Sequence, residues 1–110
     1  MTHVIATLTD AAFDHEPLPT EPGRPGATAG LIEFAPLGGV SVGLWEMTPG
    51  VMRNADEDEI FLVHSGRATL TFPATGEVVE IGPGSVVRLN AGEESVWEVH
   101  EAVRKLYVCV

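Results

Sequence analysis

Apolar and polar residues alternate along the chain from Leu31 onward. A period of two is typical of a β-strand with one buried face, because successive side chains point to opposite faces of a sheet. No segment shows a helical period of useful length. The alternation is clearest over residues 40–47, 59–64, 68–72, 78–81, 85–89, 95–99 and 104–110. We therefore expect seven or eight short strands arranged as an all-β barrel or sandwich.

Glycine and proline mark the ends of these segments. Gly66, Gly76, Gly84 and Gly92 fall between predicted strands, and Thr-Pro-Gly at 48–50 predicts a further turn. The Gly-Pro-Gly sequence at 82–84 predicts a tight corner, because proline fixes φ and glycine permits positive φ. Turns at this spacing favour many short strands over a few long ones.

The first 30 residues follow a different pattern. We expect a short strand over residues 3–8 and one helical turn after Asp10. Four prolines and two glycines between Pro17 and Gly26 then predict an extended loop, because proline interrupts regular elements. The sequence thus predicts an N-terminal strand and Pro/Gly-rich loop over residues 1–30 and a barrel domain over residues 31–110. A chain of 110 residues can bury one core without disulfides.

Charge narrows the range of partners. Acidic side chains outnumber basic ones 16 to 6, and the formal charge is -10. Such a surface repels phosphate backbones and anionic lipids, so we expect neither a nucleic acid nor a membrane as partner. Neither a signal peptide nor an apolar run of spanning length is recognisable, which favours a cytoplasmic protein. The single cysteine, Cys109, lies in an apolar run and is expected to be a packed, reduced thiol.

Two glycine-marked motifs resemble those of the cupin family. Glu59 and Gly66 have the spacing that ends the first cupin motif, and Gly84 and Gly92 fit the second, with Asn90 in place of its proline. More narrowly, the chain is similar to small cupins grouped with the (S)-ureidoglycine aminohydrolase cupin domain. The segments that carry this similarity are LWEMTPG at 44–50, DEDE at 56–59, GPG at 82–84, WEV at 97–99 and VRKLYV at 103–108.

The resemblance implies a double-stranded β-helix, which is a jelly-roll barrel, usually paired as a homodimer. We expect the predicted strand at 3–8 to pair across the dimer interface, because exposed strand edges seek main-chain partners. No particular reaction follows from the family, since cupins include isomerases, oxygenases, hydrolases and proteins that only bind.

The histidines that hold a metal ion in cupins have no counterpart here. Counting back from Glu59, the paired histidine positions hold Arg53 and Ala55 with a three-residue spacer, or Met52 and Asn54 with a four-residue spacer. The third position holds Ser95. A first-row metal needs about three protein ligands to bind firmly. We therefore expect no metal and no other cofactor.

Glu59 needs a partner if it lies inside a barrel, because burying an unpaired carboxylate is costly. One hypothesis is that the Arg53 guanidinium replaces the charge of the metal and pairs with Glu59. The alternative is that Arg53 extends into solvent at the mouth of the barrel while Glu59 binds water. The acidic run at 56–59 is expected to be a solvated turn, with only Glu59 in register with the interior.

Alternation predicts that Glu59, Phe61, Ser95 and Trp97 point inward. The expected ligand-binding residues are Trp45, Arg53, Glu59, Phe61, Ser95 and Trp97, although both tryptophans also suit a core. The favoured function is binding of a small polar metabolite, anionic or zwitterionic, without a metal. The alternative is an enzyme of nitrogen or sugar metabolism, resembling aminohydrolase or isomerase cupins, with Glu59 as catalytic acid or base. A third possibility is a dimeric accessory protein with a vestigial pocket.

Overall fold

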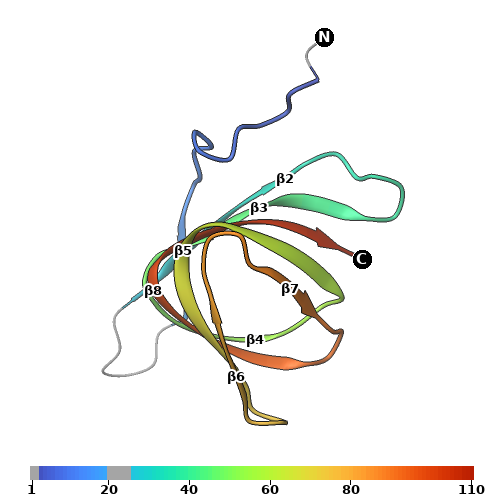
Figure 1. Cartoon of the computed structure of the whole chain (residues 1–110). Helices are drawn as coiled ribbons and strands as arrows, with labels where there is room; N and C mark the ends of the chain where they lie inside the picture. Colours follow the sequence, from blue (N-terminus) through green and yellow to red (C-terminus); the bar gives the residue numbers. More distant parts are fainter. Residues whose placement is uncertain (1–2, 20–25) are drawn as a thin grey trace.

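The computed structural model describes residues 3–19 and 26–110. Within these ranges all regular structure is β, as predicted, and there are eight strands (Figure 1). The strands are β1 (Glu16–Pro17), β2 (Thr28–Glu33), β3 (Ser41–Met47), β4 (Gly50–Ala55), β5 (Glu59–Phe72), β6 (Glu77–Ile81), β7 (Val86–Leu89) and β8 (Glu94–Cys109). The same residues contain no helix long and apolar enough to span a membrane.

Two long strands, β5 and β8, hold the barrel together. They pair with each other along most of their lengths, with register shifts between Val63 and Ala68. The first part of β8 also pairs with β4, and its last part pairs with β3. In the same way, β5 pairs first with β7 and then with β6. The eight described strands thus form one continuous hydrogen-bonded sheet, in which the two parts of each long strand pair with different neighbours.

Gly66 lies where β5 bends. Its φ is 90°, and a Cβ there would collide with the backbone of Ala102 on β8. Only glycine combines this conformation with so close an approach of two strands. The sequence predicted two strands separated by Gly66, whereas the structure has a single strand of 14 residues with a bend. The predicted strands at 95–99 and 104–110 are likewise parts of β8, which has 16 residues.

The N-terminal segment corrects two predictions. Residues 3–8 form no strand, and no helix follows Asp10; instead the carbonyl of Thr7 accepts hydrogen bonds from the N–H groups of Asp10 and Ala11 in a turn. Arg104 on β8 donates to the carbonyls of Leu8 and Thr9, which satisfies backbone acceptors that a sheet would otherwise use. Arg104 therefore ties residues 8 and 9 to the outside of the barrel, whereas residues 3–7 are exposed.

Beyond this segment, β1 pairs with β2, which begins at Thr28, three residues before the predicted start of the barrel domain. Residues 20–25, the middle of the predicted Pro/Gly loop, lie outside the described residues, as do residues 1–2.

The core confirms the predicted orientation of the strands. Phe61 and Trp97 are each 1% exposed, and Ser95 is also buried, whereas Val96 is only partly buried. The rings of Phe61 and Trp97 pack with centroids 5.4 Å apart. Trp97 belongs both to this core and to the wall of a cavity inside the barrel.

Candidate ligand-binding cavity

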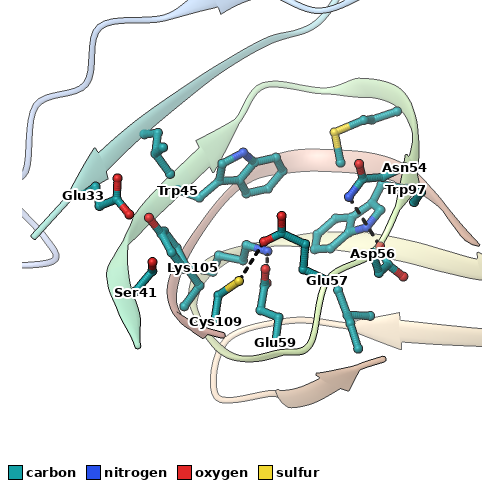
Figure 2. A pocket seen from close by; sticks show the side chains of 15 residues that line it. Glu33, Ser41, Trp45, Asn54, Asp56, Glu57, Glu59, Trp97, Lys105 and Cys109 are labelled. Carbon is teal, nitrogen blue, oxygen red and sulfur yellow. Dashed lines mark hydrogen bonds and ion pairs between the residues drawn. The ribbon is translucent and has the colours of Figure 1, made fainter. Parts of the chain in front are cut away.

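A cavity of about 390 Å³ lies inside the barrel (Figure 2). Six strands and the β4–β5 loop contribute to its wall. The apolar part of the wall consists of Leu31, Trp45, Met52, Ala55, Leu89 and Trp97. The polar part consists of Glu33, Ser41, Asn54, Asp56, Glu57, Glu59, Lys105, Tyr107 and Cys109.

An ion pair between Glu59 on β5 and Lys105 on β8 lies in this wall. The Lys105 Nζ is 2.6 Å from the Glu59 Oε2, and both side chains are largely buried. The ammonium also lies near three aromatic rings, 4.2 Å from the Phe61 centroid, 4.8 Å from Trp45 and 5.0 Å from Trp97. Burial lowers the pKa of Lys105, and the charge of Glu59 opposes that effect. Glu59 therefore has a buried cationic partner.

That partner is Lys105 and not Arg53, so the predicted Arg53–Glu59 pair is wrong. Arg53 lies on β4 opposite Val96, and its exposed side chain borders an outer groove with Pro73 and Glu94. Its neighbours Met52 and Asn54 line the cavity instead. The four-residue spacer before Glu59, which places Met52 and Asn54 at the paired histidine positions, is therefore the correct one. The three-residue spacer is off by one, and a shift of one residue moves every side chain of a strand to the other face.

Asp56 is buried in the wall of the cavity, only 4% exposed. Its Oδ1 accepts hydrogen bonds from the Ser95 hydroxyl at 2.8 Å and the Asn54 amide at 3.4 Å. Its backbone is bonded on both sides to the turn before β8, at Gly92 and Glu93. Burial raises the pKa of Asp56, the Ser95 hydrogen bond opposes this, and nearby carboxylates add to it. The expected solvated turn at 56–59 is therefore wrong at Asp56.

Two buried polar atoms in the wall have no hydrogen-bond partner within the described part of the chain, Asp56 Oδ2 and Trp97 Nε1. Leaving such groups unpaired costs free energy. One is an acceptor and the other a donor, and both belong to residues that line the cavity.

Glu57 and Cys109 form a second polar pair. The Cys109 thiol donates to Glu57 Oε2 at 2.8 Å, which Figure 2 shows beside the Lys105–Glu59 pair. The hydrogen bond to Glu57, together with burial, raises the pKa of Cys109 to about 11. The cysteine is free and buried, which confirms the predicted packed thiol.

The six predicted ligand-binding residues therefore have different positions. Trp45, Glu59 and Trp97 line the cavity. Phe61 lies behind the Lys105 ammonium, and Ser95 holds Asp56. Arg53 lies outside.

Lys105, Asp56, Glu57 and Cys109 were missed by sequence reasoning. Lys105 and Cys109 carry a usable signal, because inward-facing residues alternate along β8 from Ser95 to Val99 and again from Val103 to Cys109, with an interruption at the exposed Glu101. For Asp56 and Glu57, which lie in a loop, no periodicity indicated burial.

A family model for the EutQ-like cupin domain matches residues 34–107. The chain belongs to the EutQ-like cupin family. No curated protein matches it significantly.

Solved structures agree with this EutQ-like cupin fold. A protein of unknown function from Rhizobium leguminosarum bv. viciae is 27% identical, with a TM-score of 0.70 over 99% of this chain and 97% of that one. The Clostridium difficile EutQ protein is 20% identical, with a TM-score of 0.65 over 76% and 68%. A DUF861 family protein of unknown function from Pseudomonas syringae pv. tomato is 20% identical, with a TM-score of 0.74 over 92% and 45%. The cupin jelly-roll fold predicted from the sequence is confirmed.

The cavity of this EutQ-like cupin does not fit the metal centre of histidine-bearing cupins. Met52 and Asn54 occupy the inward positions of the paired histidines, and Ser95 bonds to Asp56. The remaining carboxylate, Glu59, is already bound to an ammonium. Over residues 3–19 and 26–110, no group of three or more histidine, cysteine, aspartate or glutamate side chains is arranged to hold a metal. The donor set therefore lacks the imidazoles that such a centre needs.

Proposed function

We propose that this EutQ-like cupin binds a small polar metabolite inside its barrel without the help of a metal ion. The observation that carries the proposal is the Lys105–Glu59 ion pair, with its 2.6 Å contact in the wall of a cavity of about 390 Å³. The Lys105 ammonium supplies the positive charge that a metal would supply beside Glu59. The cavity around the pair is left available for a ligand.

The lining supports a binding role. Small-molecule sites in proteins are mostly apolar with a few convergent polar groups, in cavities of about 300–1,000 Å³. Trp45 offers a partly buried aromatic face, and Trp97 meets it edge-on with centroids 5.4 Å apart. A ligand stacked against Trp45 would also change the fluorescence of this indole, which gives a direct reporter of binding.

A thermal-stability screen against metabolites of all charge types tests the proposal. A ligand of the folded state stabilises it by about 2.7 kcal/mol at 100 times its Kd, so the Tm must rise with ligand concentration. Trp45→Leu should weaken the binding of a cavity ligand and reduce the rise in Tm. The matched control Arg53→Ala alters a residue outside the cavity and should leave the rise in Tm unchanged. The proposal fails if no compound raises the Tm, or if every active compound acts equally on Trp45→Leu.

Elemental analysis tests the metal-free part separately. We expect less than stoichiometric zinc, iron, manganese, nickel and copper in protein purified without chelators. Three protein ligands are the usual minimum for such a metal, and Glu59 would be one of them. This part is refuted if the protein contains about one metal ion per chain and Glu59→Gln loses it.

A second candidate function is an enzyme of nitrogen or sugar metabolism, in line with the resemblance to ureidoglycine aminohydrolase cupins. The observation that favours it is that Glu59 lines the cavity in contact with an ammonium whose pKa burial lowers. Such a pair can exchange a proton with a substrate. Turnover of a cavity ligand, abolished by Glu59→Gln with binding retained, would establish the enzyme; binding without turnover favours the first proposal.

We also propose that the protein forms a homodimer through the outer face of β5, β7 and β8. Ile60 lies beside Val108, and Leu62 beside Val86, with exposures of 50%, 41%, 38% and 69%. Contiguous apolar patches of this kind mark interaction surfaces. Light scattering should find a dimer that Leu62→Asp dissociates, while Val78→Asp, at an exposed residue on β6, leaves it intact. A wild-type monomer at micromolar concentration would contradict this proposal.

A further inference from the structure

The charge of the cavity wall is strongly unbalanced. Four carboxylate side chains line it, those of Glu33, Asp56, Glu57 and Glu59, while the basic lining among the described residues is Lys105 alone. That ammonium is already bound to Glu59. Arg53, one of the residues expected to bind an anionic or zwitterionic ligand, borders a different groove. The wall therefore offers acceptors and negative charge to anything that enters.

We propose that the ligand is a small organic cation, an amine whose ammonium group is received by the carboxylates of Asp56 and Glu57. The ligand class rests on the proposed function, because it applies only if the cavity binds a metabolite at all. It replaces the anionic or zwitterionic class expected from the sequence.

Asp56 is the first observation that points to a donor on the ligand. Its Oδ1 is satisfied by Ser95 and Asn54, but its buried Oδ2 has no partner among the described residues. A buried carboxylate oxygen without a hydrogen bond is costly. Oδ2 is closed to water in this structure, so a ligand N–H group would supply the missing hydrogen bond only after a small shift of the cavity wall opens this atom. The carboxylate is held rigidly, since both its Oδ1 and its backbone are bonded to neighbouring strands and turns.

Glu57 is the second observation that points to a donor on the ligand. Its carboxylate accepts a hydrogen bond from the thiol of Cys109 at 2.8 Å. A thiol is a weak donor, whereas an ammonium carries three strong ones. An amine that enters the cavity can therefore take over this carboxylate at little cost.

The aromatic residues already bind an ammonium. Trp45 and Trp97 lie 4.8 Å and 5.0 Å from the Lys105 Nζ, so one face of each ring already makes a cation–π contact, and Trp45 is the less buried of the two rings. Trp45, together with Leu31 and Met52, also offers apolar surface for the carbon skeleton of the ligand. An anion would gain no cation–π contact and would meet the field of a chain with a formal charge of -10.

Calorimetric titration with four five-carbon probes separates the charge classes at nearly constant size: cadaverine, aminovalerate, pentanediol and glutarate. Titrations are made near neutral pH at physiological salt, which screens attraction to the outer surface. Cadaverine should bind most tightly. Its Kd should rise about ten-fold or more in Glu57→Gln and in Asp56→Asn. Glu98→Gln, at an exposed residue of β8 outside the cavity, removes the same charge and should change the Kd less than about two-fold.

Three outcomes overturn the inference. In the first, glutarate or pentanediol binds as tightly as cadaverine. In the second, cadaverine binds but Glu57→Gln and Asp56→Asn weaken it no more than Glu98→Gln does. In the third, none of the four probes binds while the wider screen finds a ligand sensitive to Trp45→Leu; the cavity is then a binding site and only the cationic class is wrong. If neither experiment finds a ligand, the proposed function fails together with it.

Discussion

Arg104 and Lys105 are adjacent on β8 and point to opposite faces of the barrel wall. Each binds a glutamate and an aromatic ring. Outside, Arg104 Nη2 is 3.1 Å from Glu46 Oε1 and its guanidinium lies 4.9 Å from the Phe13 ring centroid. Inside, the Lys105–Glu59 pair lies among three rings. The outer pair fastens the N-terminal segment to the barrel, whereas the inner pair forms part of a cavity wall.

The two pairs differ chiefly in how each glutamate is otherwise supported. Glu46 also accepts a hydrogen bond from His15 at 2.9 Å, so it keeps a partner if Arg104 is lost. Within the described part of the chain, the carboxylate of Glu59 is bound by the side chain of Lys105. The side chains of the inner pair are 8% and 16% exposed, and those of the outer pair 17% and 18%. Similar chemistry in two places should therefore contribute differently to stability.

The largest effect should follow removal of the inner cation. Lys105→Met leaves Glu59 buried and uncompensated, and breaking such a pair costs about 3–5 kcal/mol of unfolding free energy. Adding Glu59→Gln removes the stranded charge and should recover part of the loss. Urea denaturation of both single variants and the double variant measures the coupling. Additive effects of the two substitutions would show that the pair does not act as a unit.

Arg104→Ala should have a smaller global effect, about 1–2 kcal/mol, because Glu46 keeps His15 and the site is nearer to solvent. Its main consequence should be local, since the carbonyls of Leu8 and Thr9 lose their donor. Hydrogen exchange should accelerate around Asp10 and Ala11, while the amides of β5 remain protected. A uniform increase along the whole chain would contradict a local role in fastening the segment.

Acid should affect the two regions in opposite directions. Burial opposes ionisation of Glu46, but hydrogen bonds from His15 and Arg104 outweigh it and keep its pKa below 4.5. Its stabilising contribution is present above pH 4.5 and is lost as the pH falls through the folded-state pKa. Asp56 behaves in the reverse way, because burial raises its pKa above 3.8. Its protonated form therefore contributes to stability in acid, and this contribution is lost as the pH rises through the folded-state pKa.

Denaturation curves of Asp56→Asn and Glu46→Gln at a series of pH values separate these contributions. Relative to the wild type, Asp56→Asn should gain stability as the pH rises from 3.8 towards neutrality, since the amide never ionises. Glu46→Gln should lose stability at neutral pH and approach the wild type in acid. The same pH response in both variants would contradict the opposite shifts.

The smallest expected change in stability is at Glu57. With a pKa of about 11 in place of 9.0, Cys109 should hold about 100 times less thiolate near pH 8 than an ordinary thiol. Alkylation by iodoacetamide should therefore be slow in the folded protein. Glu57→Gln removes the negative charge and should accelerate the reaction with little change in Tm. An unchanged rate would show that burial alone controls this thiol.

The sequence contained more of the site than sequence reasoning used. Alternation placed Glu59, Phe61, Ser95 and Trp97 inward correctly, and the same count continued along β8 would have placed Lys105 beside them. The Arg53 hypothesis correctly expected a cationic partner for Glu59 but assigned that role to the wrong residue. The ambiguity lay in the spacer of three or four residues before Glu59, and a loop of unknown shape lies within that spacer.

Sequence alone determined the all-β class, the inward face of β5 and β8 and the absence of the histidine set, because each of these depends on residue type and on a period of two. It did not predict β1, β2 or β4, and the strand that it predicted at residues 3–8 is absent. Only the tertiary structure decided which cation meets Glu59, that Asp56 is buried and that Arg104 binds the backbone at Leu8 and Thr9. The physical reason is that those contacts join residues distant along the chain, such as Asp56 with Ser95 and Leu8 with Arg104. Which of them form depends on the register of strand pairing and the course of the loops, and neither leaves a periodic trace in the sequence.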